Sequence, residues 1–164
     1  MTAAFASRPE LDRIDRRILR ELMRDATLPI IQLAERVGLS QAPRWKPVQK
    51  LEASGIITGR VAIVDPEASG LGLTVFVEIE AADHTPKWRA TFAPIVADHP
   101  PMQEAARRAG EVDFLLKVVV SGMEAYDAFY RDLTQRLPGR NVTSQFPIER
   151  IKAITSLPID TGPA

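Results

Sequence analysis

The chain has 164 residues, 45% of them hydrophobic and 26% charged, and a net charge of zero. This composition is ordinary for a globular protein and excludes a disordered or collagen-like chain, and the length allows one domain or two small ones. Because cysteine is absent, a disulfide framework, a thiolate metal site and a thiol nucleophile are excluded. No apolar run approaches the roughly 18 residues of a membrane span, and the first ten residues lack the apolar core of a secretory signal. We therefore expect a cytoplasmic protein.

The zero net charge conceals an asymmetry along the chain. Residues 1–60 hold 11 Lys and Arg against 7 Asp and Glu, a net charge of +4, and residues 61–164 hold 10 against 14, a net charge of −4. Basic N-terminal segments often bind polyanions, but a small excess is also common on a solvated surface. The charge alone leaves both interpretations open.

Three amphipathic stripes predict three short helices in the basic part. Apolar residues recur at three- and four-residue steps through Leu11–Met23, where Asp12 can cap the helix. A second stripe covers Ile30–Val37 and ends at Gly38, and a third follows an N-cap at Ser40. A tight glycine-containing turn between the second and third helices is typical of a helix-turn-helix.

The alternation of Ile56–Val64 around Gly59 predicts a short hairpin or wing, before a turn at Asp65-Pro66. The remaining residues predict the element order βαββαβ. The expected elements are a strand at Leu73–Ile79, a helix from Thr85 to His99, strands at Met102–Ala109 and Val112–Val120, a helix from Ser121 to Pro138-Gly139, and a strand at Val142–Ile151.

Right-handed crossovers fold this order into a four-stranded antiparallel sheet with both helices on one face. The other face stays open. The strand Val112–Val120 is apolar on both sides, and Phe76 interrupts the polar side of its own strand. We therefore expect the open face to pack against another subunit, which predicts dimers.

Five independent sequence blocks follow one another along the chain. Their occurrence together, in this order, is a stronger signal than any single block. The blocks are Leu11–Leu19, Leu33–Ser40, Leu51–Ile57, Leu71–Val77 and Gly110–Leu116. Together they resemble the Lrp/AsnC family, the leucine-responsive or feast/famine regulators of bacteria and archaea, over nearly the whole chain. The resemblance implies dimers that assemble into tetramers or octamers, with amino acids as effectors.

The fold expected from pattern and resemblance is α+β. An N-terminal winged helix-turn-helix occupies residues 1–60, and a connecting strand or linker occupies residues 61–72. A C-terminal βαββαβ ferredoxin-like (ACT-like) antiparallel sheet domain, for ligand sensing and oligomerisation, occupies residues 73–164.

The second helix of a helix-turn-helix enters the major groove, so its polar residues are candidates for phosphate or base-edge contacts. The alternative is a solvated basic face. Trp45 shares its spacing with Val48 and Leu51, which favours core packing over stacking on a base. The predicted DNA-binding residues are Ser40, Gln41, Arg44, Lys46 and Lys50.

The chain departs from the family at Pro47, where members usually carry a basic residue, and at Arg44, where they carry a small residue or cysteine. Proline inside a helix lacks an N–H donor and collides with the preceding turn, at a cost of about 3 kcal/mol. The helix therefore kinks, or it starts late near Lys46 with Pro47 in a favourable first-turn position.

By resemblance, Gly110 and Asp113 match the effector loop of the family. A carboxylate can pair with the ammonium of a free amino acid, and backbone near a glycine can receive its carboxylate. The alternative is that Gly110 only turns a hairpin and Asp113 is an exposed strand residue. The implied pocket residues are Gly110, Asp113, Met123, Ser144, Gln145 and Phe146.

We predict no catalytic residue, no metal site and no cofactor. His84 and His99 are the only histidines and lie near prolines without a partner at metal-ligand spacing. The sequence also lacks a glycine-rich phosphate loop and a nucleophile-base pair.

Two functions from different classes remain open. The leading hypothesis is a sequence-specific transcriptional regulator that binds double-stranded DNA and responds to an amino acid or a related metabolite. The alternative is a metabolite-sensing assembly protein with weak or lost DNA binding, which acts through protein partners.

Overall fold

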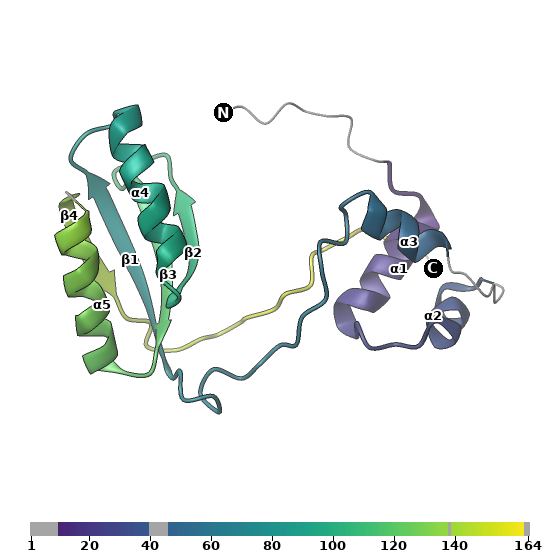
Figure 1. The fold of residues 1–164 in the computed structure, drawn as a ribbon. Coiled ribbons are helices and arrows are strands. Elements are labelled where there is room, and N and C mark those ends of the chain that lie inside the picture. The colour runs from purple at the N-terminus through teal and green to yellow at the C-terminus, as the bar shows by residue number, and fades with distance from the viewer. Residues whose placement is uncertain (1–9, 40–45, 138, 163–164) are drawn as a thin grey trace. The chain divides into compact units, whose positions relative to one another are not determined.

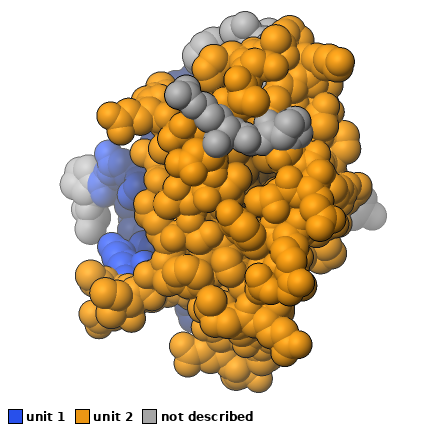
Figure 2. All heavy atoms as spheres, turned by 90° about the vertical axis from the view of Figure 1, so that its left-hand side faces the viewer, with its two compact units in different colours: residues 1–62, 152–164 blue, residues 63–151 orange. Residues whose placement is uncertain are grey.

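The computed structural model describes residues 10–39, 46–137 and 139–162. The chain divides into a helical unit, made of residues 1–62 with 152–164, and a sheet unit, made of residues 63–151. Figure 1 shows the elements and Figure 2 colours the two units. Among the described helices, none has the length and apolar character that crossing a bilayer requires.

The helical unit contains α1 (Arg13–Arg24), α2 (Ile30–Val37) and α3 (Lys46–Ala53). Asp12 caps α1 as expected, because its carboxylate accepts a hydrogen bond from the Asp15 N–H at 2.8 Å. Gly38 ends α2 in the left-handed conformation, with φ of 75°, which glycine adopts at little cost. The apolar stripes meet in one core of Ile18, Leu19, Leu33, Ala34, Val37, Val48 and Leu51.

The hairpin predicted at Ile56–Val64 is wrong, because the structure has no strand between α3 and residue 73. Val61, Ile63 and Val64 are 83%, 75% and 64% exposed. Their alternation predicted a strand, but a strand needs a neighbour to bond its backbone, and this segment does not belong to the four-stranded sheet of the described chain. Of the connecting strand or linker expected at residues 61–72, the structure has no strand, and residues 66–70 form a turn.

The sheet unit has the predicted βαββαβ order. All neighbouring strands are antiparallel, and their order across the sheet is β2-β3-β1-β4. Helices α4 and α5 lie on one face of the sheet (Figure 1). The elements are β1 (Leu73–Ala81), α4 (Pro86–Asp98), β2 (Met102–Arg107), β3 (Phe114–Val120), α5 (Met123–Arg136) and β4 (Gly139–Gln145).

The two faces of this sheet differ sharply in burial. On the helix face the side chains of β1 and β3 are buried; they are Val75, Val77, Ile79, Ala81, Phe114, Leu116, Val118 and Val120. On the other face, Phe76 pairs with Lys117 and Glu78 pairs with Leu115, and all four are only partly buried. We call this second surface the open face, and it is as apolar at Phe76, Leu115 and Val119 as the sequence predicted.

Several predicted boundaries are wrong. Strand β3 starts at Phe114 instead of Val112, because the N–H of Asp113 bonds to the carbonyl of Ile79 in a loop. Strand β4 ends at Gln145 instead of Ile151, since Pro147 has no N–H to donate to a ladder.

Helix α5 also differs from its prediction. Its N-cap is Gly122 instead of Ser121, without a side-chain hydrogen bond. Its buried residues are Tyr126, Phe129 and Leu133, while Tyr130 is only partly buried.

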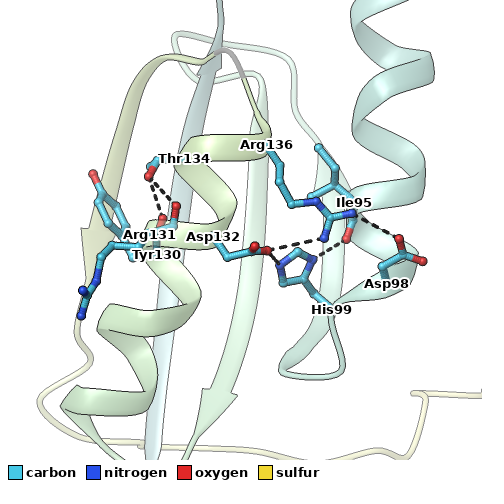
Figure 3. A network of polar contacts seen from close by, with 8 residues as sticks. All are labelled: Ile95, Asp98, His99, Tyr130, Arg131, Asp132, Thr134 and Arg136. Carbon is cyan, nitrogen blue, oxygen red and sulfur yellow. Dashed lines mark hydrogen bonds and ion pairs between the residues drawn. The ribbon is translucent and has the colours of Figure 1, made fainter.

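A polar network joins the two helices of the sheet unit (Figure 3). His99, directly after α4, has one ring nitrogen 2.7 Å from the carbonyl oxygen of Ile95 and the other 2.6 Å from the Asp132 carboxylate on α5. Arg136 reaches both Asp132, at 3.5 Å, and Asp98, at 3.2 Å. His99 is therefore a structural residue that links the end of α4 to α5.

The C-terminal segment packs on α1, which the sequence reading did not anticipate. Ile159 contacts the helical core, and the N–H of Leu157 lies 3.3 Å from the sulfur of Met23. Arg20 donates to the hydroxyl of Thr161 at 2.9 Å, and Arg16 donates to the carbonyl of Asp160 at 3.3 Å. The chain therefore passes between its two units twice.

We predict that deleting residues 157–164 destabilises the helical unit and leaves the sheet unit unchanged. The deletion uncovers apolar core surface and removes two arginine hydrogen bonds, a loss of about 1–2 kcal/mol. Protected amides of α1 should then exchange with solvent about tenfold faster. Hydrogen exchange followed by mass spectrometry measures both units at once, and the amides of β1 and β3 are the internal control. Unchanged α1 protection would contradict a stabilising role for the tail.

Candidate functional site

Helix α3 carries the part of the predicted DNA-binding set that the structure describes. Lys46 and Lys50 lie on α3, one turn apart, while Ser40, Gln41, Arg44 and also Trp45 lie outside the described residues. Pro47 follows Lys46, the first described residue of α3, and because residues 40–45 lie outside the described chain the expected kink or late start stays a prediction. Val48 and Leu51 are buried as predicted, so the opposite side of α3 faces solvent.

Lys50 makes a contact that the sequence did not predict. Its Nζ lies 2.7 Å from Oδ2 of Asp15 on α1, and the Asp15 side chain is only 3% exposed. This hydrogen bond raises the pKa of the Lys50 ammonium group above its ordinary value. Lys46, in contrast, is exposed and has no ion pair among the described residues.

Arginines of the helical unit also form ion pairs within it. Glu21, whose side chain is 11% exposed, lies 3.7 Å from Arg20, 3.7 Å from Arg24 and 3.4 Å from Arg36. Part of the positive excess of residues 1–60 is therefore neutralised at short range. A sequence count registers the charges but not the contacts that the fold creates between them.

Asp113 holds together the ends of two strands. Its Oδ2 accepts a hydrogen bond from the N–H of Ala81 at 2.8 Å, and its Oδ1 lies 3.3 Å from Nδ1 of His84. The carbonyl of Asp113 accepts from the N–H of Arg108 at 2.8 Å. Gly110, in the exposed loop before Asp113, has φ of 143°, which strains any other residue. Asp113 therefore has a structural contact to the end of β1, and its contact with an effector stays a prediction.

A small hollow opens beside Asp113 and carries charges of both signs. Trp88 and Phe114, with rings stacked 5.2 Å apart, supply its apolar part. Hydrogen bonds from the hydroxyl and N–H of Thr85 hold the pKa of Asp83 below its usual range. The residues that line the hollow are Ala81, Asp83, His84, Trp88, Arg107, Asp113 and Phe114.

The sequence reading missed Asp83, His84 and Arg107 at this hollow. Asp83 and His84 are consecutive in the loop between β1 and α4, whereas Arg107 is the last residue of β2, and no spacing in the chain connects the two places. Only the pairing of β1 with β3 and of β3 with β2 brings these three residues together. In the described part of the chain, no group of three or more His, Asp or Glu side chains is arranged to hold a metal ion.

Two of the other predicted effector residues, Ser144 and Phe146, contact Tyr126 on α5. Its hydroxyl shares a short hydrogen bond with the hydroxyl of Ser144, and Phe146 meets its ring edge-on at 5.5 Å between centroids. Burial raises the pKa of Tyr126. Met123, at the start of α5, is 60% exposed. Gln145 is on the open face, where its amide donates to Glu78 at 2.9 Å.

The predicted effector residues therefore do not form a single cluster. Asp113 bonds Ala81 at the end of β1, whereas Gln145 pairs with Phe76 nearer its start. Five residues of strand separate these positions, which is about 17 Å at roughly 3.3 Å per residue. A free amino acid is shorter than that, so within a single chain one ligand does not span both positions.

Two family models match the chain, one for each unit. The winged helix-turn-helix DNA-binding model matches residues 11–58, which contain α1 to α3. The Lrp/AsnC ligand binding domain model matches residues 74–157, which contain the sheet and its two helices except for the first residue of β1.

Similar proteins span nearly the whole chain. The DNA-binding transcriptional activator DecR of Escherichia coli (strain K12) is 46% identical over 151 residues, which cover 92% of this chain and 99% of that protein. A crystal structure of an AsnC family transcriptional regulator from Agrobacterium tumefaciens is 45% identical, with a TM-score of 0.85, and the match covers 90% of this chain and 96% of that one.

A third similar protein was solved with a ligand. It is a transcriptional regulator from Neisseria meningitidis in complex with L-Met, 32% identical, with a TM-score of 0.86 over 92% of this chain and 98% of that one. The helix-turn-helix, the four-stranded sheet and the order of both along the chain agree with these comparisons. The chain belongs to the Lrp/AsnC family of DNA-binding transcriptional regulators.

Proposed function

We propose that this regulator binds operator DNA through α3 and that a free amino acid, held between two copies of the sheet unit, shifts its DNA affinity or its assembly. The hollow beside Asp113 is the observation that supports a free amino acid as the ligand. It offers the carboxylates of Asp83 and Asp113 to an α-ammonium group and the guanidinium of Arg107 to an α-carboxylate. The L-Met complex of the similar regulator supports the same class of ligand.

A second copy of the chain is part of this proposal. The open face presents Phe76, Leu115 and Val119, and apolar sheet faces of this kind are covered in stable proteins. Two copies that pack by this face have a two-fold axis between their sheets. The proposal requires this axis to run across the strands, because that arrangement places the Asp113 end of one sheet against the Phe146 end of the other. Tetramers or octamers built from such dimers are part of the same proposal.

DNA binding is tested by mixing the purified protein with restriction-fragmented genomic DNA and sequencing the fragments that it retains. We expect a small set of fragments to be enriched, and we expect Pro47→Arg to bind them more tightly. The added arginine lies on α3 next to Lys46, and one new phosphate contact steepens the dependence of log affinity on log salt by about 0.9.

The control is the same titration on a fragment that the wild type does not retain. Equal affinity and slope for both proteins would show that α3 already docks with its proline in place. If the wild type retains nothing and Pro47→Arg does, the alternative function as an assembly protein with lost DNA binding is favoured.

Effector binding is tested by a thermal-shift screen of the proteinogenic amino acids, with Asp113→Asn as the informative variant. A ligand at about 100 times its dissociation constant stabilises the fold by about 2.7 kcal/mol, so one or more amino acids should raise the melting temperature. The amide keeps an acceptor for the N–H of Ala81 but removes the charge that pairs with an ammonium group. Asp113→Asn should therefore melt near the wild type and lose the ligand shift.

Asp113→Ala serves as the matched control, because it also leaves the N–H of Ala81 without its acceptor. It should lose about 1–3 kcal/mol of stability in the absence of any ligand. A ligand shift that survives Asp113→Asn unchanged would contradict the assignment of Asp113 to the effector site.

A further inference from the structure

The contact between Asp15 and Lys50 is the shortest ion pair that joins α3 to another helix in the described part of the helical unit. Asp15 lies in the first turn of α1 and is 2% exposed, so its carboxylate has little access to water. It accepts a hydrogen bond from the Lys50 ammonium at 2.7 Å and one from the N–H of Asp12 at 3.3 Å. The buried carboxylate thus depends on a cation that α3 supplies.

This dependence links the position of α3 to the charge pair. A buried carboxylate that loses its cation is left with an unfavourable desolvation, so the pair favours the position of α3 in which Lys50 reaches Asp15. Val48 and Leu51 hold α3 to the apolar core, but apolar contacts are not directional. The ion pair adds the direction, because it fixes one face of α3 against the start of α1.

We infer that Asp15 and Lys50 are positioning residues for DNA recognition: their ion pair orients α3 on α1, and Lys50 is not a phosphate contact. The inference rests on the proposed binding of DNA through α3. It changes the role that the sequence pattern gave to Lys50, and it gives a role in DNA binding to an acidic residue. Lys46, one turn earlier and exposed, remains available to a phosphate.

The direction in which one substitution changes DNA affinity distinguishes a positioning role from a simple charge effect. Asp15→Asn removes a negative charge from the DNA-binding unit, which by electrostatics alone strengthens binding to a polyanion. Asparagine keeps an oxygen for the N–H of Asp12 and so preserves the cap of α1. If the ion pair orients α3, the same substitution weakens binding to the specific fragment.

The experiment uses the full-length protein and a genomic fragment that the wild type retains. Affinities are measured at several salt concentrations for Asp15→Asn, Lys50→Met, the double variant, Lys50→Arg and the matched control Lys46→Met. A stoichiometric titration gives the binding-competent fraction of each protein, which separates a change in affinity from partial unfolding. Binding to an unrelated fragment gives the non-specific affinity.

We expect Asp15→Asn and Lys50→Met each to weaken specific binding about tenfold, the size of one charge-assisted hydrogen bond. The double variant should be no weaker than either single variant, because both remove the same pair. The salt slope should stay that of the wild type in Lys50→Met and fall by about 0.9 in Lys46→Met. Lys50→Arg should recover most of the affinity, and non-specific binding should change little.

Three outcomes would overturn the inference while the proposed function stands. They are specific binding by Asp15→Asn as tight as the wild type or tighter, a salt slope that falls by about 0.9 in Lys50→Met, and independent effects of the two substitutions in the double variant. If the wild type retains no fragment at all, the proposed function fails and this inference fails with it.

Discussion

Helices cover only one face of the sheet, and the rest of the structure depends on this constraint. The βαββαβ order with right-handed crossovers places α4 and α5 on the same face, so the buried side chains of β1 and β3 form one core with them. The open face keeps Phe76, Leu115 and Val119 partly accessible. In the proposed dimer a second copy of the chain covers these residues. Predicted effector residues about 17 Å apart along one sheet, at Asp113 and Gln145, then come together from different copies.

Many charged side chains of the helical unit form ion pairs with one another. Buried or nearly buried carboxylates at Asp15 and Glu21 hold Lys50 and several arginines, so the excess of positive charge near the N-terminus is not simply a surface for DNA. An ion pair between two helices fixes the orientation of one helix on the other, because its geometry is directional. It adds little attraction to DNA, because the opposite charges largely cancel at long range. Orientation of α3 and attraction to phosphates are therefore separate properties of different residues.

Elements whose signal is local were predictable from the sequence. The alternation of β1, the cap of α1 by Asp12 and the left-handed Gly38 all follow from nearby residues. The crossover rule then places both helices of the sheet unit on one face. Family resemblance located Asp113, but its bond to Ala81 N–H depends on the pairing of distant strands. The contact of Lys50 with Asp15 spans 35 residues and has no sequence signal. The exposed segment at 58–64 was misread because alternation predicts a strand whether or not a partner exists.

The most direct test of an effector site shared between copies is a mixture of two defective chains. One chain carries Asp113→Asn, the other carries Phe146→Ala, and light scattering first establishes that each assembles like the wild type. After the two are unfolded and refolded together, half of the dimers contain one copy of each and one site of every such dimer has neither defect. Calorimetric titration with the stabilising amino acid should find about a quarter of the wild-type number of sites, although each variant alone has none. A mixture that binds no amino acid would contradict a site built from both copies.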